Sequence, residues 1–532
     1  MTGEATVDGS PKEAGSTRLS LLLAAAMFVL VVDTSLMNVS ISAVVEDLDT
    51  KVSSVQSAIA LEALVSAAFI LISSKIGDLF GRKRAYVLGL LGYAIGAVAM
   101  TLAQSLTAII IFWAIIGGLG ASLLLPAMQS LIHGNFEGAA QKKTYALIGA
   151  AAAIAAAVGP LLGGFVTTYL SWRVGFLLEA VVIAVVLSQI GLLKDVPYTG
   201  ARQVDAIGAV LSVLGMGGVV LGILVWQEGG DYVVLLIAIG ALALWALARW
   251  LVRRHRDGKV TLLNPDLFRL PHFRIGITGQ MLQNITLGGA MIALPIFLQI
   301  KLEYDALETG LSLAPLSLTM FAVAILAGRR SGGLRPAQII RTGFALSTLG
   351  MALIVPIVPE ADSGWYLFIP LVIAGAGLGL LVSQLNNYSL APIDDERISE
   401  AAGVNSASGS FGLSFGLAMA GGILLATLSL AFTNMTNASP VIPSSQQQQI
   451  AQTLEDDAQV VSNTQLDELL ADEPPAVREE ILGINTDATN LALQIALLVP
   501  ILAGLLGLFN SLRMMRLPDV ELSTSVEAAA LA

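Results

Sequence analysis

The chain has 532 residues, of which 55% are hydrophobic and only 13% are charged, and its formal net charge is −11. About a quarter of the residues of a soluble domain are charged, so this composition excludes an ordinary soluble protein. The chain has no cysteine, which excludes disulfide bonds, and its three histidines are scattered, so we expect neither a metal site nor a bound cofactor. Repeated apolar runs of 18 or more residues predict an all-α membrane protein with many spans.

Fourteen spans follow one another along the chain. Their predicted limits are 19–45, 54–73, 85–104, 108–132, 144–168, 174–193, 206–226, 232–251, 273–300, 309–327, 338–358, 365–391, 402–432 and 488–512. The first apolar run is too long for a signal-peptide core, so we expect it to be retained as a span. The spans divide the chain into an N-terminal tail (1–18), a six-helix bundle (19–200), an inserted helix pair (201–262), a second six-helix bundle (263–516) and a C-terminal tail (517–532).

The basic residues test this count, because Lys and Arg concentrate in cytoplasmic loops. With the N-terminus inside, 24 of the 28 Lys and Arg fall on the cytoplasmic side, and the exceptions are Lys51, Arg173, Lys301 and Arg478. Both termini are therefore predicted to be cytoplasmic. The long loop 433–487 is then extracellular and supplies −9 of the net charge. We expect a solvated, partly helical connector there, or else a cap that attracts cations to the outer mouth.

The turn between the second and third spans reads SSKIGDLFGRKRA. Topology alone explains its basic residues, but it does not explain an aspartate, Asp78, at a fixed spacing before Gly81, Arg82 and Lys83. These four residues resemble the signature loop of the major facilitator superfamily. The resemblance implies a conformational latch between two halves of the protein, and the acidic loop 391–400 could supply the partner.

The fifth span contains AAAIAAAVGPLLGGFV, in which small residues allow close helix packing and the proline bends the helix. Such a face occurs in many membrane proteins. The order of four residues is more specific and resembles the antiporter motif of the same superfamily: Gly159, Pro160, Gly163 and Gly164. The resemblance implies that this packing seals the two halves against leak, which favours export over uptake.

Two further stretches, DTSLMNVSIS in the first span and SWRVGFLLE at the start of the sixth, resemble the fourteen-span drug:proton antiporters of this superfamily. Asp33 and Asn38 match the first-span motif, and the similarity runs through nearly the whole chain. The fourth span departs from the family, because AIIGGLGAS has Ala114 where the family has an arginine. That arginine is associated with proton handling, so the buried acids are left as the proton carriers.

Three acidic residues interrupt apolar runs, Asp33, Glu62 and Glu179. A carboxylate at the centre of a membrane costs about 2.5–3.5 kcal/mol on insertion scales, and low polarity favours the neutral form of a carboxyl group. Asp33 and Glu62 are predicted near mid-membrane, whereas Glu179 is shallower. The alternative, which we favour for Glu179, is a protonated group that hydrogen-bonds a neighbouring helix. Polar residues of the second half could complete a cavity wall or bond one helix to another: Gln280, Asn284, Gln384, Asn386, Asn387, Asn405 and Ser408.

Together these features predict a major facilitator fold that works by alternating access. We predict proton-coupled efflux of lipophilic, cationic drugs across a bacterial-type plasma membrane, with Asp33, Glu62, Asn38 and Glu179 as the proton and substrate site. The alternative in the same fold is an exporter of a lipid or an amphipathic metabolite. A transport-inactive scaffold or sensor is less favoured, and no enzymatic residue set is visible. The expected partners are lipophilic small molecules and membrane lipids, with protons as the coupling ion, no nucleic acid, and a monomeric protein.

Overall fold

The structure is a computed structural model, and the part of the chain that it describes contains helices and connecting turns but no strand. The described residues are 11–136, 138–195, 205–227, 230–329, 334–394, 397–442, 462–471 and 473–518. Thirteen helical segments among them are long and apolar enough to cross a membrane. The sixth predicted span corresponds to a shorter helix of 17 residues, α8, that packs beside the others. The predicted all-α membrane fold is therefore confirmed.

The N-terminal half begins with a helix that breaks at Ser40, so its first predicted span is two helices. A stretch of π-helix, η1, interrupts the fourth span. The elements of this half are α1 (Pro11–Val39), α2 (Ile41–Leu48), α3 (Val52–Phe80), α4 (Arg82–Thr101), α5 (Leu106–Ala108), η1 (Ile109–Gly117), α6 (Gly118–Asn135), α7 (Gly138–Tyr169), α8 (Trp172–Ser188) and η2 (Ile190–Leu192).

The inserted pair, α9 (Ala206–Gln227) and α10 (Val233–Arg256), precedes the second half. That half has a second π-helical turn, η4, at the end of its first span. Its elements are η3 (Pro265–Arg269), α11 (Pro271–Ile296), η4 (Phe297–Lys301), α12 (Ala306–Arg329), α13 (Pro336–Ile354), η5 (Gly364–Leu367), α14 (Phe368–Leu390), α15 (Ile398–Ala438), α17 (Asn463–Leu469), α18 (Pro475–Ala496) and α19 (Leu498–Met514).

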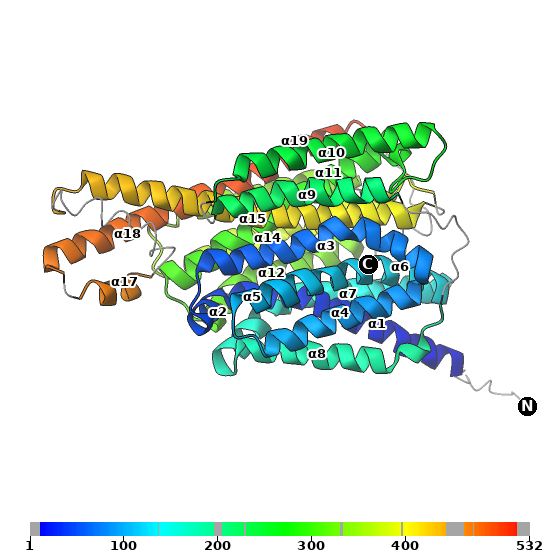
Figure 1. Cartoon of the computed structure of the whole chain (residues 1–532), viewed down its shortest axis with the longest axis horizontal. Helices are drawn as coiled ribbons and strands as arrows, with labels where there is room; N and C mark the ends of the chain where they lie inside the picture. Colours follow the sequence, from blue (N-terminus) through cyan, green and yellow to red (C-terminus); the bar gives the residue numbers. More distant parts are fainter. Residues whose placement is uncertain are drawn as a thin grey trace, which may run out of the picture.

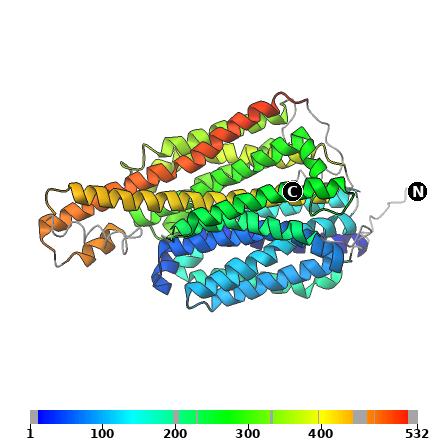
Figure 2. The ribbon, with the colours of Figure 1, turned by 45° about the horizontal axis from the view of Figure 1, so that its top comes forward.

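The inserted pair lies at the seam between the halves. α9 packs against α3 of the first half and α15 of the second, while α10 packs mainly on α9 (Figures 1 and 2). The Gln227 side chain ties α9 to both halves, because its Nε2 donates to the carbonyl of Ala418 and its Oε1 accepts from Ser57 Oγ at 3.2 Å. α10 has a broad exposed face, because only 17% of its most apolar 18-residue stretch is buried.

The two ends of the bundle differ in charge. The end that carries Arg84, Arg253 and Arg341 is called the basic end here, and the opposite end, which carries Asp49 and Glu303, the acidic end. At the acidic end α15 and α18 extend beyond the other helices and carry α17 (Figure 1). The described part of the acidic loop is thus partly helical, as predicted, although its flanking helices reach further into it than predicted.

The apolar core joins the halves mainly at the acidic end. One buried cluster contains the acidic-end portions of α1, α3 and η1 together with most of the second half. At the basic end, the buried core of the N-terminal half, from Leu19 to Leu193, contains no residue of the second half. There only Ile70 and Leu71 of α3 share a fully buried cluster with the insert and the second half. Among the described residues, then, the halves are fused at the acidic end and more separate at the basic end.

Candidate functional site

Asp33 lies in the interior of the N-terminal half, with 1% of its surface exposed. The indole Nε1–H of Trp113 donates to both of its carboxyl oxygens, at 3.0 Å each. The phenolic hydroxyl of Tyr93 on α4 donates to Oδ2. Two neutral donors from two other helices therefore hold the carboxyl group, and no Lys or Arg side chain of the described residues takes part.

The π-helix η1 carries Trp113 toward Asp33. A π-helix widens the turn and changes which side chains face inward, and such turns are frequent at functional sites. Within this segment Ala114, which stands where the family has an arginine, is fully buried in the apolar core. The neighbouring tryptophan thus supplies a hydrogen-bond donor to Asp33 in a fourth span that lacks the family's charge. The sequence offered one signal for Tyr93 and Trp113: buried Tyr and Trp usually find a hydrogen-bond partner.

Glu62 on α3 and Glu179 on α8 are also buried, with 8% and 4% of their surfaces exposed. Both lie within electrostatic reach of Asp33, so we call these three residues the carboxyl cluster. Both carboxyl oxygens of Glu179 are buried and accept no hydrogen bond from the described residues. This finding goes against the hydrogen-bonded alternative for Glu179 and places that residue with the other two acids.

Asn38 lies five residues after Asp33, about one and a half turns along the helix and near the end of α1. Its Nδ2 donates to the Thr34 carbonyl at 2.7 Å, whereas its Oδ1 is buried and has no partner in the described structure. Its main-chain carbonyl accepts from Gln299 Nε2 at 3.4 Å. Gln299 Oε1 accepts from both the amide and the hydroxyl of Ser42, at 3.0 and 2.7 Å. Asn38 therefore lies at a junction between the halves that the π-helical turn η4 provides.

The glycines of the fifth span make close helix contacts on two sides. A β-carbon on Gly159 would lie 2.6 Å from Ser35 Cβ, and one on Gly163 would lie 2.8 Å from Leu36 Cα, so α7 approaches α1 closely. A β-carbon on Gly164 would overlap the carbonyl oxygen of Ala306 on α12. From the α12 side, Gly310 faces the carbonyl of Pro160 in the same way. The four predicted motif residues thus lie where α7 meets both its own half and the other half.

The predicted latch lies between α3 and α4. Gly81 has φ +101°, a conformation that favours glycine, and a β-carbon there would lie 3.0 Å from Asp195 Oδ2. The Lys83 amide donates to Asp195 Oδ1 at 3.1 Å, and its Nζ donates to the Leu193 carbonyl at 2.6 Å. These contacts are within the N-terminal half and not with the loop 391–400. The side chain of Asp78 and residues 395 and 396 lie outside the described part, so a latch across the halves stays a prediction, as does the role of Arg82.

The polar residues of the second half are used partly in bonds between helices. Asn405 Nδ2 donates to Asn386 Oδ1 at 3.0 Å, and Ser408 Oγ donates to the Ile277 carbonyl at 3.3 Å. Asn284 bonds within its own helix, to the Gln280 carbonyl at 2.9 Å. Bonds between helices thus account for Asn386, Asn405 and Ser408 but not for Asn284, and a role of these residues in the cavity wall stays a prediction.

A pocket of about 730 Å³ opens at the acidic end, between the halves and under α17. Asp49 and Glu303 line it, and both have positive φ, +46° and +55°. Thr464 covers it and donates its amide and hydroxyl to Glu303, at 2.9 and 2.6 Å. Partial burial favours the neutral form of Glu303, but these bonds and one from Ser462 outweigh it and hold the pKa of Glu303 below its ordinary value. The first turn of α17 is thereby fastened to the mouth between the halves.

Comparison with known proteins agrees with this architecture. The sequence profile of the Major Facilitator Superfamily matches residues 23–417. The chain belongs to the major facilitator superfamily. The fold also resembles that of the POT family transporter PepTSo, with a TM-score of 0.61 over 94% of this chain and 99% of that one at 13% identity. A bacterial homologue of the human lysosomal transporter Spinster is similar, with a TM-score of 0.60 over 96% and 99% of the two chains, also at 13% identity.

Among sequence relatives, the chain is 25% identical to the probable actinorhodin transporter of Streptomyces coelicolor, over 74% of this chain and 70% of that protein. It is 28% identical to the puromycin resistance protein pur8 of Streptomyces alboniger, over 75% and 80% of the two. It is 26% identical to the multidrug resistance protein Stp of Mycobacterium tuberculosis, over 78% and 77%. As a member of this superfamily, the chain is a membrane transporter and not an enzyme.

Proposed function

We propose that this transporter exports lipophilic, cationic compounds in exchange for protons, and that the carboxyl cluster binds both. The observation that carries the proposal is the burial of Asp33, with Glu62 and Glu179 also buried and each within electrostatic reach of it. No Lys or Arg occurs between residues 19 and 50, 52 and 74, 85 and 141, 144 and 172, or 174 and 193. The spans around the cluster thus contain no fixed positive charge to neutralise it.

Charge balance then links the two ligands. Ionised carboxylates repel one another in an interior of low polarity, so the cluster is stable only when protons or a cation neutralise it. A proton that enters from outside displaces a cation that was bound from inside. When the site faces the cytoplasm again, a new cation displaces the proton. Exchange of one proton for one monovalent cation moves no net charge, so the membrane potential drives export only when a further proton enters with each cation exported. Each such net charge moved through 100 mV is worth about 2.3 kcal/mol, which corresponds to roughly a 50-fold substrate gradient.

The orientation of export is part of the proposal. We place both termini in the cytoplasm of a bacterial-type plasma membrane, because the basic end carries most of the Lys and Arg. The acidic end then faces outside, and the seal of α7 against α12 lies on the outer side of the cluster. The names of the relatives, which refer to an actinorhodin transporter and to resistance to puromycin and to multiple drugs, support export of drugs over uptake.

The test measures proton movement in proteoliposomes that hold a pH-sensitive dye, after addition of a lipophilic cation such as ethidium. Asp33→Asn should abolish substrate-driven proton movement, while Glu360→Gln, which changes an exposed acid at the acidic end, should leave it unchanged. Proton movement that persists in Asp33→Asn overturns the assignment of Asp33. Glu62→Gln separates the alternative, because an exporter of a lipid or amphipathic metabolite should depend little on Glu62.

A further inference from the structure

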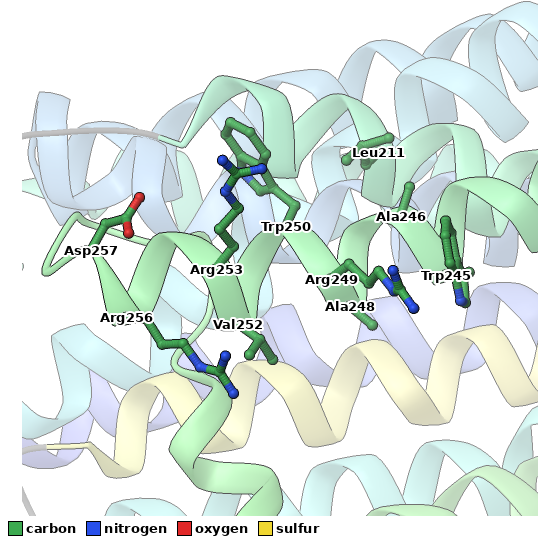
Figure 3. Close-up of a pocket in the computed structure, with 10 residues that line it drawn as sticks. All are labelled: Leu211, Trp245, Ala246, Ala248, Arg249, Trp250, Val252, Arg253, Arg256 and Asp257. Atoms are coloured by element: carbon green, nitrogen blue, oxygen red, sulfur yellow. The ribbon is translucent and has the colours of Figure 1, made fainter.

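The inserted helix α10 has a groove of about 820 Å³ at the basic end that the transport cycle proposed above does not use. Figure 3 shows the side chains that line it, which come from α10 except for Leu211 of α9 and Asp257, the residue that follows α10. Three of them are arginines on one side of the helix, spaced by four and three residues: Arg249, Arg253 and Arg256. All three are exposed.

These three arginines differ from their neighbours in having no carboxylate partner within the described residues. Arg254, one position along, faces Asp205 at 3.7 Å and donates to the Val260 carbonyl at 2.5 Å. His255 contacts Asp266 at 2.9 Å. The one acid beside the groove, Asp257, lies 3.9 Å from Lys259. The groove therefore presents excess positive charge, while the opposite side of the same turn is neutralised inside the protein.

The arginines continue an apolar stripe on the same face of α10. The exposed members of that stripe recur at helical spacing: Val234, Leu235, Leu242 and Trp245. Arg249 stacks on Trp245, with the guanidinium carbon 4.4 Å from the ring centre. The 24 residues of α10 rise about 36 Å, enough to cross a hydrocarbon core of roughly 30 Å. Val234 and Leu235 therefore lie near the acidic end of the span, whereas Leu242 lies near its middle and Trp245 lies between that point and the arginines. Leu242 and Trp245 thus lie at the depth of the acyl chains of the leaflet at the basic end, and the arginines lie toward the headgroups of that leaflet.

We propose that this groove binds an anionic phospholipid, with its phosphate at the guanidinium group of Arg253 and its acyl chains along Leu242 and Trp245. Arg249 and Arg256 lie about one turn to either side on α10 and add positive charge around the headgroup. Guanidinium groups match phosphate because their planar forks donate two parallel hydrogen bonds. Trp250 lines one side of the groove and is held in place by its Nε1–H, which donates to Asp205 at 2.9 Å. The inserted pair thereby holds a lipid at the seam between the halves, where α9 contacts both.

General membrane topology offers a competing explanation, since basic residues accumulate at cytoplasmic loops and at the C-terminal ends of helices. That explanation assigns no importance to the face on which the arginines lie. It therefore treats them like the exposed arginines at the basic end of α13 and α19, which are Arg341, Arg513 and Arg516. The proposed site and the topological explanation thus give different expectations for two triple variants of equal charge.

The experiment is native mass spectrometry of the full chain in detergent, titrated with phosphatidylglycerol or with phosphatidylcholine of the same acyl chains. One arginine near an anionic surface contributes about 1 kcal/mol, so Arg253→Gln should weaken phosphatidylglycerol binding about fivefold. The triple change of Arg249, Arg253 and Arg256 to Gln should weaken it roughly 100-fold. The single variant keeps the test informative if the triple variant does not insert.

The matched control changes Arg341, Arg513 and Arg516 to Gln and should alter phosphatidylglycerol binding less than twofold. Phosphatidylcholine should bind equally to all variants. Equal loss in the two triple variants, or equal binding of the two lipids to the parent chain, overturns the proposal. A lipid-free dimer that the groove variants dissociate also overturns it, because a second copy of the chain would then be the occupant.

Discussion

Closure of the acidic end depends on the contact between α7 and α12, and Gly310→Ala tests it directly. A β-carbon on Gly310 would overlap the carbonyl oxygen of Pro160 and lie 2.9 Å from its carbonyl carbon. Ordinary contact between carbon atoms is about 3.5–4.0 Å, so the helices must separate by roughly 0.6–1.1 Å. Backbone carbonyls cannot rotate away as a flexible side chain does, and overpacking of this kind costs about 1–3 kcal/mol. Because the contact joins the two halves, that energy should act on the closed state of the acidic end.

A cost of about 1–3 kcal/mol changes the ratio of closed to open acidic ends by roughly 5- to 150-fold. The chain contains no cysteine, so spin labels on Thr50→Cys and Asp362→Cys report the distance between the halves at this end without background. Gly310→Ala should shift that distance distribution toward longer values and slow drug export. The control is Gly403→Ala, because a β-carbon on Gly403 meets no atom within 4 Å. If Gly310→Ala gives the same distances and transport rate as the control, the α7–α12 contact does not govern closure.

Three further predictions concern residues that the structure brings into the argument. Glu179→Gln should leave the melting temperature within about 2 °C of the parent value, because the carboxyl oxygens of Glu179 accept no bond from the described residues. The same change should reduce the number of protons moved per substrate. An unchanged stoichiometry would remove Glu179 from the carboxyl cluster. Gln299→Leu should lengthen the distance between the halves at the acidic end, because it removes two bonds from Ser42, and identical spin-label distances would contradict this. Docking of the segment around Thr464 should weaken as the pH falls from the ordinary pKa of 4.5 through the lowered pKa of Glu303. A lowered pKa stabilises the docked state fully above the ordinary value, and that stabilisation is lost once the carboxylate is protonated in the docked state. Hydrogen exchange at residues 462–465 measures this, and Glu303→Gln should remove the pH dependence.

The sequence could predict the parts of this protein that follow from apolar length and from charge along the chain. A membrane span needs about 20 apolar residues whatever its neighbours are, so the spans and their alternation were readable, including the short α8. Asp33 and Glu62 stood out for the same reason, because a carboxyl group within an apolar run is costly wherever the helix packs. The glycine spacing of the fifth span also indicated close packing before its partners were known.

What the sequence could not supply is the set of partners across helices. Trp113 reaches Asp33 through the π-helix η1, and Gln299 joins the halves through η4; a π-helix depends on how a helix is packed and leaves no periodic signal in the chain. A hydrogen bond to a neighbouring helix was the favoured alternative for Glu179, because its position in the span is shallow. The sequence could not reveal that both carboxyl oxygens lack a donor among the described residues. The partner of Lys83 likewise proved to be Asp195, in the same half.

By itself, the sequence determined the class of protein, the number and alternation of its spans, and the presence of buried acids, because each depends on the local free energy of placing residues in a membrane. The tertiary structure decided which acids lie together, which neutral donors hold Asp33, and which end of the bundle is closed. These depend on the rotation and contact of helices distant in the chain. Helices of the same apolar composition can pack in several ways, and only side-chain shape and hydrogen bonding select among them.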